Sequence, residues 1–404
     1  MPTTATKLTS AQLRVVATLG FCGLVSAADN WFVSPALPSI AAGLSVVPGA
    51  AAVVLTAYLV PYGTLQPVCG AVGDAVGRLW LLRAIVLGLA AGTLLCAVVP
   101  SLPLLVVARV VTGCFAAGII SVSQAFVGDV VGPRSRAGAV GILMGITFTG
   151  QGLSAGLGGI LTDLVGWRAA FASFGALALV AWLLLFGLRE PVRDEGDEAP
   201  APTAADGSPV ASFLGEAGRV LAGPGRPVFA LACTTGVAFL GVYGLMGTFL
   251  AEACGLTATQ AGLVMMLYGV LCLVGGASSG RLGARGGLSR VVSVGEASGV
   301  VAALALLASA LSGSWAPSLL GAACLGLGYI LVQPTLVTLS MDADPEHAGL
   351  CTGLVGLGVF AGGGAGSALG GLVLRAGGYP ALWGVAALAL AAQLVASRRL
   401  LAGR

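Results

Sequence analysis

The sequence predicts an all-α membrane protein with twelve transmembrane helices arranged as two six-helix bundles. Of its 404 residues, 57% are hydrophobic and only 9% are charged, whereas soluble domains contain roughly 25% charged residues. The chain also divides into twelve apolar runs, each about as long as a helix that crosses the hydrocarbon core. One polar segment separates the first six runs from the last six.

The first six runs form the predicted amino-terminal bundle, residues 1–189. Charged residues or Gly and Pro, which interrupt helices, separate the runs from one another. The first run continues into Pro35 and Pro38 without a short apolar region and a small-residue cleavage site. We therefore expect it to remain in the mature protein rather than to act as a signal peptide. The runs lie near residues 12–38, 47–70, 79–99, 102–130, 137–162 and 167–189.

Residues 190–225 form a predicted cytoplasmic linker, and residues 226–404 form the predicted carboxy-terminal bundle. The linker begins with acidic residues and continues rich in Ala, Pro, Gly and Ser, a composition that buries too little apolar surface to order itself. Its residues 212–221 have a weak amphipathic pattern, which fits either a helix on the membrane surface or a solvated linker. The last six runs lie near residues 226–251, 257–280, 288–312, 316–340, 347–374 and 378–400.

The basic residues predict the orientation of the helices. If the amino terminus is inside, sixteen of the 19 Lys and Arg residues lie on the cytoplasmic side or at that edge. Arg168 and Arg375 then face outward, and Arg109 lies in the membrane. We therefore expect a multi-pass protein of the cell membrane with both termini in the cytoplasm.

Composition also excludes several classes of protein. The net charge is only +3, and the basic residues do not cluster with aromatic ones, so a nucleic-acid surface is not expected. With one histidine (His347) and one lysine (Lys7), the chain has neither a His-pair zinc site nor a Walker A lysine. The nine cysteines have no CxxC spacing. We expect no metal, no other cofactor and no enzyme activity.

The two halves resemble each other in their glycines. A shift of 212 positions places Gly141 on Gly353 and Gly150 on Gly362, which aligns the fifth run with the eleventh. Repeats that are six spans apart and share one orientation predict two bundles related by an axis along the membrane normal. Such an arrangement has its binding site at the interface of the bundles, near the midplane.

Four passages carry a resemblance to a known family. The loop after the second run reads Gly70-Ala-Val-Gly-Asp74-Ala-Val-Gly77-Arg78, which resembles the GxxxDxxGR signature of the major facilitator superfamily. Arg109-Val-Val-Thr-Gly113 in the fourth run, the fifth-run glycines and Gly166-Trp-Arg-Ala-Ala-Phe171 also fit. The resemblance covers essentially the whole chain, and it implies the major facilitator fold and a transporter.

For the loop signature, the resemblance implies a cytoplasmic gating motif that latches the two halves when the outside is open. Its members would be Gly70, Asp74, Gly77 and Arg78, and Asp129 at the end of the fourth run is a candidate partner of Arg78. Solvated loop charges are the alternative. Ala75 and Leu79 stand where the family usually has basic residues, and the second copy at residues 276–285 lacks the carboxylate. The latch is therefore expected on one side only.

The fifth run resembles the glycine-rich signature of the family's antiporters. Ser154-Ala155 stands where that signature has Gly-Pro, which weakens the inference of an antiporter. Small residues at this spacing also permit close helix contact, so packing alone could explain them. The matching residues are Gly141, Gly150, Gly158 and Gly159.

Asp29 and Arg109 are the candidate coupling residues. A charge near the bilayer centre is costly, so such residues usually find a partner and mark an ion or substrate path. Helix rise places Asp29 in the first run and Arg109 in the fourth run at similar depth. In drug and proton antiporters of the superfamily these positions are associated with protonation and substrate binding, which is what the resemblance implies here. A structural ion pair is the alternative, and for Glu296 in the ninth run a structural role is preferred.

Polar and aromatic residues within the runs are candidates for lining a substrate cavity, although each alone could be ordinary packing. Aromatic rings and amides with few charges suit an apolar or amphiphilic substrate. The candidates are Asn30, Tyr58, Tyr62, Gln124, Gln151, Tyr243, Tyr268, Tyr329 and Gln333.

The predicted function is export of a small amphiphilic compound, such as a drug or secondary metabolite, in exchange for protons. Asp29 would carry the proton, and Arg109 would tune Asp29 and contact the substrate. The expected partners are the substrate, protons and the lipid bilayer, and the protein is expected to be a monomer. One alternative is proton-coupled import of a small metabolite whose anionic group binds Arg109. Another is a sensor that does not transport.

Overall fold

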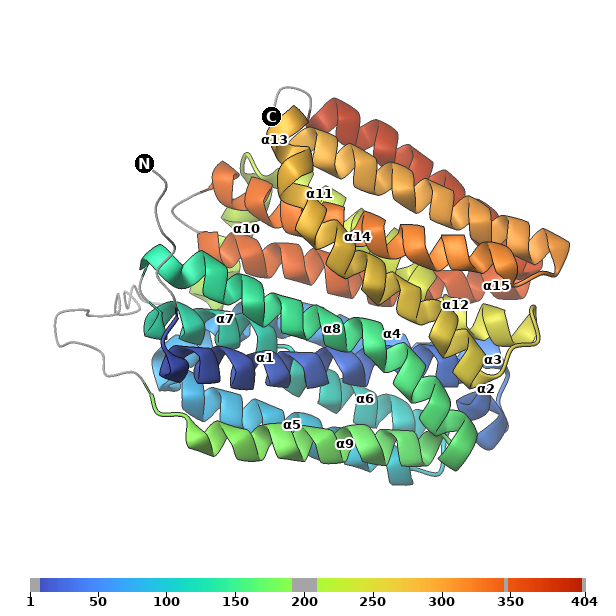
Figure 1. Cartoon of the computed structure of the whole chain (residues 1–404), viewed down its shortest axis with the longest axis horizontal. Coiled ribbons are helices and arrows are strands. Elements are labelled where there is room, and N and C mark those ends of the chain that lie inside the picture. Colours follow the sequence, from blue (N-terminus) through green and yellow to red (C-terminus); the bar gives the residue numbers. More distant parts are fainter. Residues whose placement is uncertain (1–7, 132, 191–208, 345–347, 402–404) are drawn as a thin grey trace.

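The computed structural model describes residues 8–131, 133–190, 209–344 and 348–401. Every regular element in these ranges is a helix (Figure 1). Eleven helical segments are long and apolar enough to cross a membrane, and the last of them covers 52 residues, Gly349–Leu400. Gly378 has a φ of 69° and interrupts that segment, and each of the two parts is long enough to span a bilayer. The predicted all-α membrane fold is confirmed, and twelve crossings fit the helices.

Residues 8–131 and 133–190 form nine α-helices and a short 3-10 helix, η1 (Leu185–Gly187). Thr9 starts the first helix with a capping box, because its hydroxyl accepts a hydrogen bond from the Gln12 amide at 3.2 Å. The first predicted run is divided between α1 and α2, and the fourth between α6 and α7. The helices are α1 (Ser10–Trp31), α2 (Val33–Gly43), α3 (Pro48–Ala51), α4 (Val53–Val76), α5 (Arg78–Val98), α6 (Leu102–Ala116), α7 (Ile119–Val130), α8 (Pro133–Val165) and α9 (Trp167–Leu184).

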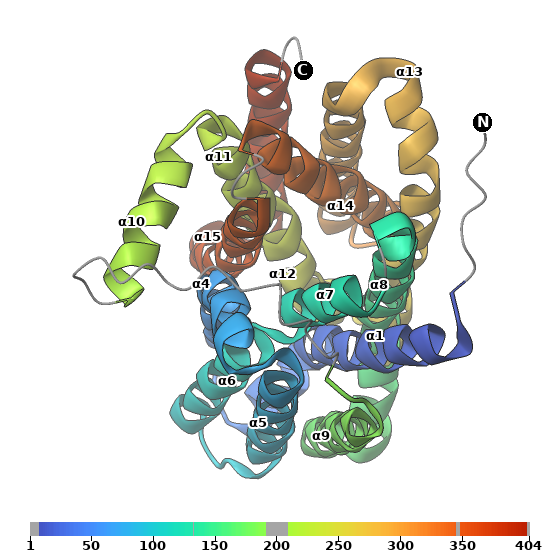
Figure 2. The same cartoon turned by 90° about the vertical axis from the view of Figure 1, so that its left-hand side faces the viewer.

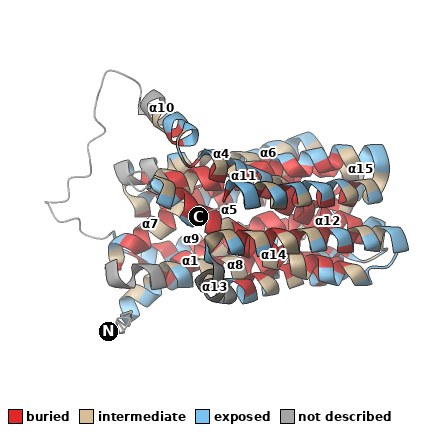
Figure 3. Cartoon of the chain, turned by 90° about the horizontal axis from the view of Figure 1, so that it is seen from above, coloured by how far each residue is buried: buried red, intermediate tan, exposed pale blue. Residues whose placement is uncertain are grey.

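The carboxy-terminal half begins with a helix inside the predicted linker. Ala217 and Val220 of this helix, α10, are buried, and α10 packs against α11 and α15. Residues 209–222 are therefore helical rather than unstructured linker, and Figure 3 shows α10 projecting from the main body. The elements are α10 (Pro209–Ala222), α11 (Arg226–Thr235), the π-helix η2 (Gly236–Leu240), α12 (Gly241–Glu252), α13 (Ala258–Ser312), α14 (Ala316–Ala343) and α15 (Ala348–Leu400).

The helices of the two halves form two groups that lie side by side. Figure 2 shows α1 and α4 to α9 in one group and α11 to α15 in the other. The groups meet where α8 packs on α13, α4 on α15 and α2 on α12. Below, α1 to α9 are called the amino-terminal bundle and α11 to α15, with η2, the carboxy-terminal bundle.

Glycines bring the two bundles into backbone contact. A Cβ atom added to Gly152 of α8 would lie 2.6 Å from the Cα of Gly269 in α13, and one added to Gly159 would lie 2.1 Å from the Ala258 carbonyl oxygen. No side chain fits in either place. Two of the fifth-run positions, Gly150 and Gly158, pack in the same way on Leu24 and Phe32 of their own bundle.

Candidate coupling site and contacts between the bundles

Asp29 of α1 and Arg109 of α6 form a buried ion pair. Their side chains are 1% and 0% exposed, and Arg109 Nη1 lies 2.8 Å from Asp29 Oδ2. Thr93 of α5 donates a second hydrogen bond, from its hydroxyl to Asp29 Oδ1, at 2.8 Å. Three helices of the amino-terminal bundle thus hold one carboxylate, and both its oxygens accept a hydrogen bond.

The remaining surface of the Arg109 guanidinium is mostly aromatic. Its Cζ lies 4.2 Å from the ring centre of Tyr58 and 5.8 Å from that of Phe171, distances at which an aromatic face attracts a cation. Its Nε and Nη2 are buried without a hydrogen-bond partner among the described residues. Leaving such donors unpaired is unfavourable, so these two N–H groups can bind an additional oxygen acceptor.

From Arg109, stacked rings lead to the interface of the bundles. Tyr58 stacks on Tyr62 with 5.7 Å between ring centres, and Tyr62 contacts Phe360 of α15 edge to face at 4.7 Å. The Tyr58 hydroxyl donates to the Ser26 carbonyl oxygen at 3.3 Å. Tyr58, which contacts Arg109, is therefore separated from the other bundle by the single ring of Tyr62.

A second group of predicted cavity residues meets across the interface. Gln151 Nε2 of α8 donates to the Tyr268 hydroxyl of α13 at 3.2 Å. The Tyr268 ring lies 4.2 Å from that of Tyr243 and 6.1 Å from that of Tyr329, and Tyr243 lies 4.9 Å from Trp31 of α1. These aromatic side chains are buried and fill the space between the bundles.

The other predicted cavity residues lie apart from these contacts. Asn30, next to Asp29, is buried, and its Oδ1 has no partner among the described residues. Gln124 of α7 is half-buried, and its Nε2 lies 2.9 Å from Met144 Sδ within the amino-terminal bundle. Gln333 is half-buried on α14. Neither glutamine belongs to the aromatic contacts at the interface.

At the predicted cytoplasmic end, Arg78 pairs with Asp129 of α7 and donates to the Ala125 carbonyl oxygen at 2.9 Å. The preceding Gly77 has a φ of 96°, which favours glycine. The side chain of Asp74 and the packing of Gly70 lie outside the described part of the structure. The described part of the gating motif therefore fastens helices of one bundle to each other.

Glu190 makes a contact that was not predicted from the sequence. Its Oε1 accepts a hydrogen bond from the Arg78 amide at 2.9 Å, and its Oε2 accepts one from the Leu79 amide at 3.0 Å. It thus caps the start of α5, where an anion is favoured by the helix dipole. The sequence contained a signal for this contact. Glu190 follows the sixth run, which ends on the same side of the membrane as the third run begins.

At the opposite, predicted outer end, hydrogen bonds made by three side chains join the bundles. Ser34 of α2 donates to the Gly244 carbonyl oxygen of α12 at 2.8 Å. Asp163 of α8 accepts from the Thr259 amide at 2.7 Å and from the Ala258 amide at 3.2 Å, and so caps α13. Arg375 of α15 donates to the Gly49 carbonyl oxygen at 3.4 Å. We call Ser34, Asp163 and Arg375 the outer seal.

Toward the other end of α8, close neighbours are missing at two glycines. A Cβ added to Gly141 or Gly145 would meet no atom of the described residues within 4 Å. This differs from Gly152 and Gly159 farther along the same helix, which touch the backbone of α13. The described contacts of α8 with the other bundle are therefore closest at its predicted outer end.

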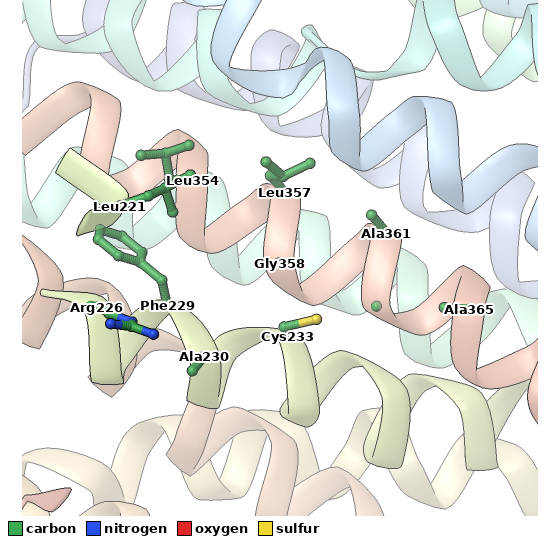
Figure 4. A pocket seen from close by; sticks show the side chains of 11 residues that line it. Leu221, Arg226, Phe229, Ala230, Cys233, Leu354, Leu357, Gly358, Ala361 and Ala365 are labelled. Atoms are coloured by element: carbon green, nitrogen blue, oxygen red, sulfur yellow. The ribbon is translucent and has the colours of Figure 1, made fainter. Parts of the chain in front are cut away.

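An apolar pocket of about 480 Å³ lies elsewhere, between α11 and the first half of α15 (Figure 4). Leu221 of α10 lies at one end, and Arg226 is the one charged residue among its lining side chains. Neither Asp29 nor Arg109 lines it. This pocket is separate from the coupling pair, whose polar contacts and burial make it the better candidate for a functional site.

The layout of the chain agrees with a comparison against known families, in which the model described as Major Facilitator Superfamily matches residues 19–356. The chain belongs to the major facilitator superfamily. Relatives in this superfamily are named as transporters. The predicted membership of this superfamily is therefore confirmed.

Curated relatives of this superfamily member are transporters. An uncharacterised MFS-type transporter of Mycobacterium tuberculosis is 29% identical over 388 residues, covering 83% of this chain and 55% of the relative. The multidrug resistance protein fnx1 of Schizosaccharomyces pombe is 32% identical over 165 residues, covering 40% of this chain and 31% of the relative. The chain thus spans about half the length, or less, of these relatives.

Solved structures share the fold. A bacterial homologue of the human lysosomal transporter Spinster, in an inward-facing and unoccupied conformation, gives a TM-score of 0.70 at 19% identity, over 98% of this chain and 96% of that one. A POT family peptide transporter gives a TM-score of 0.73 at 16% identity, over 96% of each chain. At these identities the likeness extends to the major facilitator fold alone.

Proposed function

We propose that this transporter exports a small amphiphilic compound in exchange for protons. The observation that carries the proposal is the buried pair of Asp29 and Arg109, with Thr93 as the second donor to the carboxylate. A buried carboxylate with one cationic partner can exist in two states, paired as an anion or protonated and neutral. Intramembrane ionisable residues of this kind commonly serve as proton relays.

Protonation of Asp29 would change what Arg109 binds. A neutral Asp29 no longer balances the guanidinium charge, so Arg109 would shift its interactions toward other acceptors and toward the Tyr58 ring at 4.2 Å. Tyr58 contacts Tyr62, which contacts Phe360 of the other bundle. In this way a change in the charge of Asp29 would alter contacts at the interface between the bundles. We propose that residues 1–189 rock against residues 226–404 along this interface.

The aromatic interface suits an amphiphilic substrate. Tyr243, Tyr268 and Tyr329 offer ring faces, and Gln151 offers an amide at their edge. Few charges and several aromatic rings are typical of sites for largely apolar ligands. We propose that separation of the bundles on the cytoplasmic side, while the outer seal holds, exposes these residues to the substrate.

Export is also supported by the names of relatives. They include an MFS-type efflux pump of Mycosarcoma maydis, 28% identical over 182 residues, and the fission yeast multidrug resistance protein, 32% identical over 165 residues. We further propose a monomer in the cell membrane with both termini in the cytoplasm, as the basic residues predict.

Import of an anionic metabolite is the second candidate. The two Arg109 donors without a described partner favour it, because they could bind a carboxylate or phosphate. Proteoliposomes with a set pH gradient distinguish the candidates. If the protein exports its substrate by antiport, fluorescent amphiphilic dyes should move in the direction opposite to the proton flux. Accumulation of an anionic metabolite along an inward proton gradient, without dye transport, would contradict the export proposal.

The outer seal gives a prediction about conformation. Asp163→Ala removes the cap from α13, and loss of a cap costs about 1 kcal/mol, enough to change the ratio of two conformations by about fivefold. We expect the outer ends of the bundles to separate more often. The distance between the outer ends can be measured with spin labels at Leu164 and Leu311, which are 76% and 70% exposed. The labels are attached in a variant that lacks the native cysteines.

Glu252→Gln is the matched control for this measurement. Glu252 is also an acid near the outer end, but it accepts a hydrogen bond from Tyr379 of its own bundle. Its replacement should leave the distribution of label distances unchanged. An unchanged distribution in Asp163→Ala would mean that Asp163 does not contribute to the closed outer side.

A further inference from the structure

Glu296 of α13 is a second buried acid, and it lies in the bundle opposite to Asp29. Its side chain is 0% exposed. Ser397 of α15 donates a hydrogen bond to Glu296 Oε2, and the Gln393 side chain, one turn earlier, also interacts with the carboxyl group. Gln393 Nε2 donates to Thr235 Oγ1 of α11 at 2.7 Å. Three helices of the carboxy-terminal bundle thus meet in one small polar cluster.

The cluster lacks one hydrogen-bond donor. Glu296 Oε1 and Gln393 Oε1 are both buried and accept no hydrogen bond from any described residue. The Thr235 hydroxyl already donates to the Leu231 carbonyl oxygen at 2.7 Å. Buried oxygens without a donor cost free energy. One proton on the Glu296 carboxyl group would neutralise its charge, which lowers the cost of leaving Oε1 buried without a donor.

The surroundings of Glu296 contain no cation in contact with it among the described residues. Arg398, which is exposed on α15, is the one charged group that acts on it, from a distance. The other elements bring apolar or uncharged atoms. α14 places Leu331 and Val332 beside Gly295, and η2 places Phe239 beside Gly299. An ionised carboxylate would be expensive in this place, because charges are buried only when paired. This is the opposite of the setting of Asp29, which has Arg109.

We propose that Glu296 binds a proton and is a second proton site of the transporter. The neutral acid donates from its carboxyl group to the Gln393 amide oxygen and accepts from Ser397. Asp29 is stabilised as an anion by a guanidinium, whereas no cation among the described residues contacts Glu296. This inference does not depend on the direction of transport or on the role of Asp29.

Infrared spectroscopy of the purified full chain in lipid nanodiscs tests the proposal. A protonated carboxyl group has its own C=O stretching band, separate from the carboxylate bands. We expect such a band at neutral pH in the wild type and in Asp29→Asn, and its loss when Glu296→Gln is combined with Asp29→Asn. The exposed acid variant Glu252→Gln should retain it. Absence of the band in Asp29→Asn, or its persistence in folded Asp29→Asn/Glu296→Gln, would overturn the proposal.

A second variant keeps the test decisive if Glu296→Gln does not fold. Gln393→Leu removes the proposed acceptor but leaves the acid in place. The band should then move to higher frequency, because the O–H group loses its hydrogen bond to the amide oxygen. A band at the wild-type frequency in Gln393→Leu would show that Glu296 does not donate to Gln393, and would contradict the proposed site.

Discussion

Asp29→Asn is expected to abolish transport driven by a proton gradient while the protein remains folded. The amide keeps the size of the side chain and can still accept a hydrogen bond from Thr93, which lies 2.8 Å away. It cannot take up or release a proton, so the two states that Asp29 provides are lost. Dye flux in proteoliposomes under an imposed pH gradient should fall to the level of empty liposomes.

Two controls separate coupling from binding. Exchange of labelled for unlabelled substrate without a pH gradient should persist in Asp29→Asn, because it needs alternating access but no net proton movement. Thr93→Val removes only the hydrogen bond from an uncharged donor to Asp29 Oδ1, so it should alter the pH dependence of transport without abolishing it. Full proton-driven flux in Asp29→Asn would refute Asp29 as the coupling residue.

Arg109→Met should be the most destabilising substitution at the site. Arg109 is fully buried and is the one cation in contact with Asp29 among the described residues. Removing one partner of a buried ion pair typically costs about 3 to 5 kcal/mol, because the other charge is left uncompensated. The free energy of unfolding in detergent, or the thermal unfolding midpoint, measures the loss.

The double variant Asp29→Asn/Arg109→Met should recover much of that stability. Without the carboxylate, no uncompensated charge stays in the bundle, and replacing both partners is often nearly neutral. A double-mutant cycle therefore yields the coupling energy of the pair. If the double variant is as unstable as Arg109→Met alone, the pair does not hold the helices together, and the loss comes from the packing of Arg109 on Tyr58 and Phe171.

The sequence predicted the transmembrane segments well because hydropathy is a local property. The run near 102–130 coincides with α6 and α7, and the run near 79–99 corresponds to α5. The similar depth of Asp29 and Arg109 followed from helix rise alone, and in the structure their side chains meet. Thr93 could not be predicted as a partner, because which side of α5 faces α1 depends on the rotation of the helix.

Contacts between the bundles were beyond prediction for a different reason. Asp163, Ser34 and Arg375 meet their partners across 90 residues or more of chain, and no local pattern encodes how two rigid bundles face each other. The sequence did not decide between a helix and a solvated linker at α10. Its apolar residues pack on α11 and α15, which are not its neighbours in a local sequence pattern. Predicted cavity residues such as Gln124 failed to join the interface because depth alone does not decide which way a side chain points.

The outer seal consists of side chains on one bundle that bind main-chain atoms of the other. Ser34 and Arg375 donate to carbonyl oxygens, and Asp163 accepts from amides. Every residue type offers the carbonyl oxygen, and every type except proline offers the amide. Substitutions at Gly49 or Ala258 that keep the backbone in place would therefore leave these hydrogen bonds intact. In related chains the two sides of this seal can diverge independently, so paired changes in sequence would not reveal it.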